Sequence, residues 1–166
     1  MSYPANPYGN PEDSTAQNSL DLPRYGASFG EAVKRYFKKY ATFSGRASRS
    51  EYWWVVLFNA LVAIVAVAIM AMGGAFNVPT NSTEMPPGAI PGVLLLTLYG
   101  LATFIPGLAL IVRRFHDGNF SGWLYLLALV PFFGSLAVLI FVLMPSNPAG
   151  ARFDKGHAWP AGQPTS

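Results

Sequence analysis

The chain has 166 residues, of which 52% are hydrophobic and only 11% are charged, with a net charge of +3. Soluble domains carry about 25% charged residues, so this composition argues against an ordinary soluble protein. Cysteine is absent, which excludes disulfides, thiolate catalysis and zinc–thiolate sites.

Residues 1–27 are predicted to form a disordered N-terminal tail. The segment is rich in Pro, Asn, Ser and Tyr and has too little aliphatic content to build a core. It also has no apolar stretch like that of a cleaved signal peptide. The first apolar run is therefore expected to serve as an uncleaved anchor.

An interfacial amphipathic helix is predicted over residues 28–41. Ser28 and Glu31 have the spacing of a capping box. Apolar and aromatic side chains recur at helical spacing on one face, and basic residues occupy the other. The basic residues Lys34, Arg35, Lys38 and Lys39 are predicted to contact anionic lipid headgroups. Packing of this helix on the cytoplasmic ends of the spans is an alternative, and both can hold.

Three long runs contain no Asp, Glu, Lys or Arg, and they cover about residues 53–72, 89–112 and 123–144. A helix needs about 20 apolar residues to cross the hydrocarbon core of a bilayer. The sequence therefore predicts an all-α membrane protein with three transmembrane helices. Asn59 in the first run is expected to form a hydrogen bond between helices, and Pro106 should kink the second.

The third run is interrupted in its middle at residues 131–134, Pro-Phe-Phe-Gly. Its halves, about 8 and 10 residues long, would each extend only about 12 to 15 Å as helices, so neither could span alone. The run is therefore either one kinked span or a re-entrant hairpin. We favour the kinked span. Residues 28–154 then form the membrane domain, and 155–166 form a second disordered tail.

The charge distribution predicts the topology. The loop over residues 73–88 has no Lys or Arg, whereas six basic residues lie within about 20 positions before the first span: Lys34, Arg35, Lys38, Lys39, Arg46 and Arg49. The positive-inside rule therefore places the N-terminus in the cytoplasm. Beside a membrane span, such a basic stretch indicates anionic lipid rather than nucleic acid. The C-terminus would lie outside with three spans and inside with a hairpin.

An even number of spans separates two charged segments, so both should reach the same membrane face. We call their side chains the charged cluster: Arg46, Arg49, Glu51, Arg113, Arg114, His116 and Asp117. We expect Glu51 and Asp117 to pair with arginines. Arg49 and Asp117 are one candidate pair, which a double-mutant cycle would test.

Three short motifs resemble those of one known family. They are Gly45-Arg-Ala-Ser-Arg-Ser-Glu-Tyr-Trp53, Arg113-Arg-Phe-His-Asp117 with Ser121-Gly-Trp123, and Pro148-Ala-Gly-Ala-Arg-Phe153. On these motifs the chain is similar to the domain of unknown function 805 (DUF805), small bacterial inner-membrane proteins, over about residues 33–154. Ala151 stands where that family usually has Asn. The resemblance implies a bacterial plasma membrane protein with several spans and brings no reaction with it.

His116 and Asp117 form the only adjacent His–acid pair, and an enzyme site would also need a nucleophile, a metal or a lined pocket. The sequence has no Gly-x-Ser-x-Gly elbow, paired-His metal spacing, Walker-type loop or dinucleotide fingerprint. We therefore predict no catalytic, metal-binding or cofactor-binding residue. The alternative is a membrane enzyme or an accessory transporter subunit that uses the charged cluster.

The function that these observations favour is a non-catalytic membrane component that binds lipid or a partner. The expected partner is a bilayer with anionic headgroups, because a basic and aromatic helix lies next to the spans. A membrane protein partner or a second copy of the chain stays open, and no nucleic acid is expected.

Overall fold

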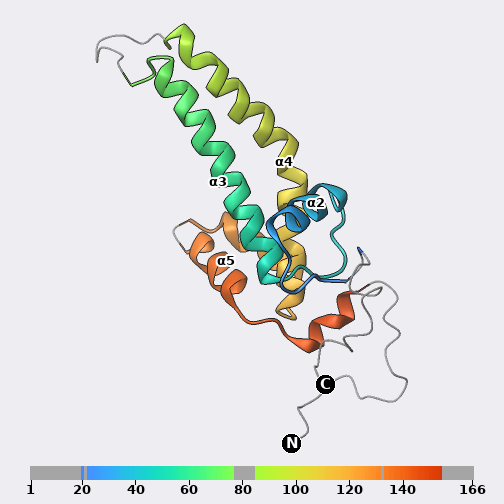
Figure 1. Cartoon of the computed structure of the whole chain (residues 1–166). Helices are drawn as coiled ribbons and strands as arrows, with labels where there is room; N and C mark the ends of the chain where they lie inside the picture. Colours follow the sequence, from blue (N-terminus) through green and yellow to red (C-terminus); the bar gives the residue numbers. More distant parts are fainter. Residues whose placement is uncertain (1–19, 21, 77–84, 132, 155–166) are drawn as a thin grey trace, which may run out of the picture.

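The computed structural model describes residues 20, 22–76, 85–131 and 133–154, and every regular element among them is helical. In chain order the elements are α2 (Phe29–Lys38), α3 (Arg49–Met72), η1 (Pro87–Ala89), α4 (Ile90–Asp117), η2 (Gly122–Leu129), α5 (Gly134–Leu143) and η3 (Pro148–Phe153). Figure 1 shows two long helices side by side, with α2, η2, α5 and η3 gathered around one end of the pair and η1 at the other. We call the first of these ends the packed end.

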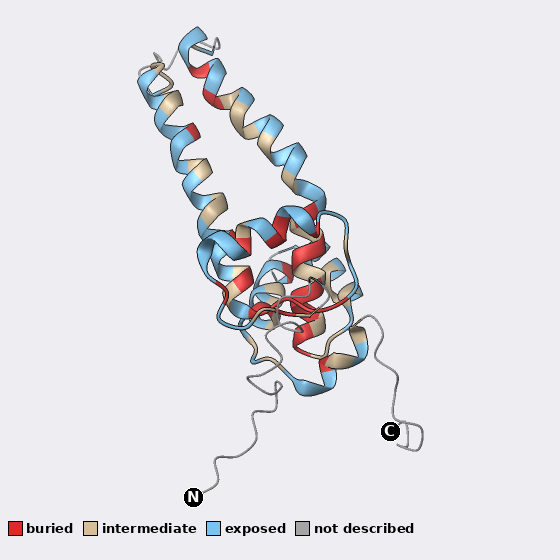
Figure 2. Cartoon of the chain, turned by 45° about the vertical axis from the view of Figure 1, so that its right-hand side comes forward, coloured by how far each residue is buried: buried red, intermediate tan, exposed pale blue. Residues whose placement is uncertain are grey.

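Among the described helices, α3 and α4 are long and apolar enough to cross a membrane. Only 11% and 17% of their most apolar stretches are buried, and Figure 2 shows that their surfaces are largely exposed away from the packed end. A core helix of a soluble protein would instead be covered by its neighbours. Such apolar exposure fits helices whose surroundings are lipid.

The far ends of α3 and α4 approach closely because small residues line the contact. A Cβ atom on Gly92 would lie 2.6 Å from the carbonyl oxygen of Ala66. Gly73 and Gly88 meet in the same way, since a Cβ on Gly88 would lie 2.7 Å from the carbonyl oxygen of Gly73. Helix pairs in membranes commonly use small residues to bring their backbones together.

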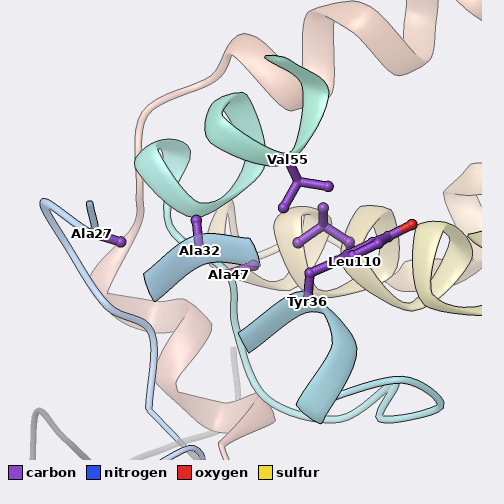
Figure 3. Packing of buried hydrophobic residues seen from close by; sticks show 6 residues of the cluster. All are labelled: Ala27, Ala32, Tyr36, Ala47, Val55 and Leu110. Carbon is purple, nitrogen blue, oxygen red and sulfur yellow. The ribbon is translucent and has the colours of Figure 1, made fainter. Parts of the chain in front are cut away.

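Helix α2 begins with the predicted capping box between Ser28 and Glu31 and packs across α3 and α4. Its inner face contributes Ala32 and Tyr36 to a small core that also includes Val55 of α3 and Leu110 of α4 (Figure 3). The spacing predicted this helix. Its packing on the spans is the alternative that the sequence left open.

The segment before α2 is more ordered than the sequence indicates. Ala27 is buried in the same core, and its amide donates to the Ser50 hydroxyl at 3.0 Å. The carbonyl oxygen of Arg24 accepts from the Ser48 hydroxyl at 2.6 Å. The predicted boundary at residue 27 is therefore wrong for residues 22–27. Apart from residue 20, the rest of that predicted tail lies outside the described residues, as does the tail at 155–166.

The third apolar run forms a hairpin of two short helices, η2 and α5, which pack on each other. Helix α5 has 10 residues, about 15 Å, which is half the thickness of the hydrocarbon core. The turn depends on Gly134, since a Cβ there would lie 1.9 Å from the carbonyl oxygen of Leu127. The run is therefore two short helices packed on each other, which is the chain path of the hairpin alternative, and the third transmembrane helix that we favoured is not confirmed.

Candidate functional site

The three motifs singled out in the sequence converge at the packed end. The Gly45 amide donates to the carbonyl oxygen of Phe153 at 2.8 Å, and the Gly45 carbonyl oxygen lies 3.0 Å from His116 Nδ1. The His116 and Phe153 rings stack with centroids 4.0 Å apart and planes 4° apart. Gly45 has a φ of 80°, a conformation that favours glycine.

The third motif closes over the end of α4. A Cβ on Gly150 would lie 2.3 Å from the carbonyl oxygen of His116, so only glycine fits there. The Asn147 amide donates to the carbonyl oxygen of Asp117 at 2.7 Å. η3 is therefore held against the last turn of α4 by backbone contacts.

Arg46 and Asp154 form a nearly buried ion pair with an Nη2–Oδ2 distance of 2.6 Å. Burial alone would lower the pKa of Arg46, but the hydrogen bond and charge of Asp154 outweigh it and raise the pKa above its ordinary value. Asp154 was not among the residues predicted from the sequence. A signal was available, because this acid directly follows the third motif in a segment with few other acids.

Asp117 is fully buried and accepts three side-chain hydrogen bonds. Arg114 and Ser146 donate to Oδ2, and the Tyr25 hydroxyl donates to Oδ1 at 2.8 Å. Burial, together with the neighbouring Asp117 charge, raises the pKa of Tyr25. This tyrosine belongs to the segment predicted to be a disordered tail, so its contact with Asp117 was not predicted.

Arg114 joins Asp117 to the hairpin. Its Nε donates to the carbonyl oxygen of Val142 at 3.1 Å, and its Nη2 donates to that of Met144. These carbonyls lie at the C-terminal end of α5, where backbone acceptors lack partners within the helix. The end of the third run therefore returns to the end of α4, where the run began.

Glu51 forms the second buried pairing. Arg35 Nε donates to Glu51 Oε1, and the Ser48 amide donates to Oε2 at 2.9 Å as part of the capping box of α3. Arg113 lies on the neighbouring helix with 1% of its surface exposed, and its carbonyl oxygen accepts from the Ala47 amide at 2.9 Å. Within the described part of the chain, Arg113 Nη2 has no hydrogen-bond partner.

Two expected placements differ in the structure. Arg35 and Lys39 are buried, so the prediction that the basic residues of the first helix contact lipid does not hold for these two, whereas Lys34 and Lys38 are exposed. Arg49 donates to the carbonyl oxygen of Met144 at 3.3 Å, whereas Asp117 takes Arg114 as its arginine partner.

The chemistry available to His116 and Asp117 follows from their different neighbours. The imidazole is bound to Gly45 and stacked on Phe153, while the carboxylate is bound by Arg114, Tyr25 and Ser146. The carboxylate therefore neutralises an arginine rather than orienting the imidazole. No group of three or more His, Asp or Glu in the described residues is arranged to hold a metal ion.

Together, the two membrane-length helices and the converging motifs define a small helical membrane protein. Residues 40–155 match the family model described as a protein of unknown function, DUF805, and the chain belongs to this family.

Curated relatives agree with this assignment. The chain is 41% identical over 117 residues to the inner membrane protein YhaI of Escherichia coli strain K12, covering 70% of this chain and 86% of that protein. It is 33% identical over 119 residues to the inner membrane protein YhaH of the same strain, covering 72% and 89%. The bacterial inner membrane is therefore its location. No solved structure matches the chain.

Proposed function

We propose that this protein is a non-catalytic component of the inner membrane whose helix α2 binds anionic headgroups of the cytoplasmic leaflet. The observation that carries the proposal is the outer face of α2. Lys34 and Lys38 are exposed one helical turn apart, and Phe29 and Phe37 are also exposed, at 37% and 43%. A basic and aromatic face on a helix beside the membrane suits the headgroup region.

Aromatic contacts between α2 and α3 fix the position of this face along the span. Phe29 lies edge-on to Trp54 with ring centroids 5.9 Å apart, and Phe37 lies edge-on to Phe58 at 6.1 Å. Both partners belong to the first half of α3. The aromatic side of α2 therefore faces the apolar part of the span, and its lysines are free to meet headgroups.

The cytoplasmic orientation is supported by charge. The chain has no Lys or Arg between residues 50 and 112, so its basic residues are concentrated near the packed end. Basic residues close to spans favour the cytoplasmic side.

A lipid-selectivity measurement tests the proposal. The full chain is placed in nanodiscs of phosphatidylcholine and phosphatidylglycerol, and the lipids retained on release are counted by native mass spectrometry. Each lysine near an anionic surface contributes about 1 kcal/mol, so replacing both Lys34 and Lys38 by Gln should reduce the preference for phosphatidylglycerol about thirty-fold at low salt. The matched variant with both replaced by Arg should keep the preference. An unchanged preference in the Gln variant would contradict the proposal.

A further inference from the structure

An apolar pocket of about 640 Å³ lies between the second half of α4 and η2. Its walls include Leu108 and Val112 of α4, Trp123 and Leu126 of η2, and Phe43 from the segment that follows α2. Small-molecule sites are typically clefts of about 300–1,000 Å³ with mostly apolar walls and a few polar groups. The pocket has this size and character.

The pocket changes from apolar to polar along the axis of α4. Leu108, Val112 and His116 lie on one face of the helix at intervals of four residues, which places His116 about 12 Å from Leu108. Ser121 lies at the same end as His116 because it belongs to the turn after α4. Lipids of the adjoining leaflet have the same polarity, with their chains toward the middle of the spans and their headgroups at the ends.

His116 presents one defined polar atom to this end of the pocket. A carbonyl oxygen only accepts hydrogen bonds, so the contact with Gly45 places a proton on Nδ1. In the neutral imidazole, Nε2 then carries a lone pair. Nε2 lies beside Gly122, only 3.2 Å from where a Cβ of that residue would be, and both residues line the pocket. Nε2 is therefore placed to accept a hydrogen bond from a hydroxyl group.

A cation lies at the rim. The guanidinium carbon of Arg152 is 4.6 Å from the centroid of the Phe153 ring, and Phe153 both lines the pocket and stacks on His116. Arg152 is itself exposed. Its planar group suits phosphate oxygens, which makes the rim complementary to an anionic headgroup.

The geometry points to a phospholipid-binding site in this pocket. One acyl chain lies between α4 and η2, the phosphate meets Arg152, and a headgroup hydroxyl donates to His116 Nε2. The ligand class is an anionic phospholipid with a hydroxyl-bearing headgroup, such as phosphatidylglycerol. The site goes beyond the surface proposed on α2, because it uses neither Lys34 nor Lys38.

The test uses the full chain in nanodiscs that contain phosphatidylglycerol with a photoreactive diazirine on its acyl chain. Labelled positions are mapped by peptide mass spectrometry. Label should concentrate on residues 108–126 and should be displaced by unlabelled phosphatidylglycerol more readily than by phosphatidylcholine. Leu126→Trp should reduce this label by filling the pocket. The matched control is Leu129→Trp, which lies on the same element at 78% exposure, is not among the pocket residues, and should leave the label unchanged.

The charged rim has its own measurement. Arg152→Gln should lower the preference of the pocket label for phosphatidylglycerol over phosphatidylcholine about five-fold, the equivalent of about 1 kcal/mol. The variant with Lys34 and Lys38 replaced by Gln should leave this preference intact, so the two lipid proposals can fail separately.

Three results would overturn the pocket proposal. One is label spread evenly along α3 and α4. Another is a preference for phosphatidylglycerol that Arg152→Gln leaves unchanged. The third is an unlabelled pocket together with disulfide-linked dimers of a Leu126→Cys variant, which would show that a second copy of the chain covers it.

Discussion

Glu51 and Asp117 are buried carboxylates at the packed end, and each forms an ion pair with an arginine. The partner of Glu51 comes from another helix, whereas the partner of Asp117 lies in the preceding turn of the same helix. Arg35 binds Glu51 and Arg114 binds Asp117. Removing one partner of a buried ion pair costs more than the pair itself contributes, because the remaining charge stays away from water. These pairs therefore make the packed end intolerant of single charge changes.

Glu51→Gln is expected to destabilise the protein by about 3–5 kcal/mol, since it leaves Arg35 buried without its counter-charge and next to the buried Arg113. Thermal unfolding in detergent micelles measures the effect. Glu31→Gln is the matched control because Glu31 has the same position in the capping box of α2 but is exposed. It should melt close to the parent protein, and equal shifts in the two variants would contradict the role of burial.

The burial of Arg35 illustrates which side-chain contacts were readable from the sequence. All basic residues of the helix were predicted to lie on one polar face. Ala32, Arg35, Tyr36 and Lys39 nevertheless follow the spacing i, i+3, i+4 and i+7, which is one stripe of a helix, and the structure buries all four. The stripe was a usable signal for their burial. The identity of the acid that meets Arg35 depends on tertiary packing, which no spacing rule supplies.

At the scale of elements, α2 is attached to α4 where a proline interrupts the helix. Pro106 has no amide hydrogen, so the carbonyl oxygen of Ala102 loses its helical donor. The Tyr40 hydroxyl donates to this oxygen at 2.6 Å, and the Tyr36 hydroxyl donates to the carbonyl oxygen of Thr103 at 3.1 Å. The proline thus frees an acceptor that Tyr40, just after α2, uses.

Tyr40→Phe should therefore cost about 0.5–1.5 kcal/mol, the usual net contribution of one hydrogen bond, because it leaves the Ala102 carbonyl without its donor. The same substitution in a Pro106→Ala background should cost close to nothing, because the alanine amide can donate to Ala102. Thermal unfolding of the four proteins gives the coupling energy. An equal cost of Tyr40→Phe in both backgrounds would show that the proline does not create the acceptor that Tyr40 serves.

The third apolar run shows why element type was harder to predict than element position. The sequence located its ends and its interruption, and it excluded either half as a span on length. The choice between a kink and a turn depended on whether the halves pack on each other. Gly134 allows that packing, and Arg114 holds the returning end beside α4.

At the scale of the whole molecule, the protein is a pair of membrane-length helices with most of the other elements packed around one end. The described far end contains little beyond the close contact of α3 with η1 and α4, whereas α2, the hairpin and η3 all join the packed end. The pairing of the two spans brings the motif that precedes α3 to the motif that ends α4. Function should therefore be sought at this one end.

This architecture predicts that both ends of the described chain lie on one side of the membrane. Because the chain has no cysteine, single cysteines report their location directly. Ser44→Cys and Ala149→Cys are exposed positions at the packed end, and Phe76→Cys lies at the far end with 72% exposure. In intact spheroplasts, a membrane-impermeant maleimide should label only the cysteine at 76. After permeabilisation it should label all three. Labelling at 149 before permeabilisation would show that the third run crosses the membrane, and labelling at 44 would reverse the proposed orientation.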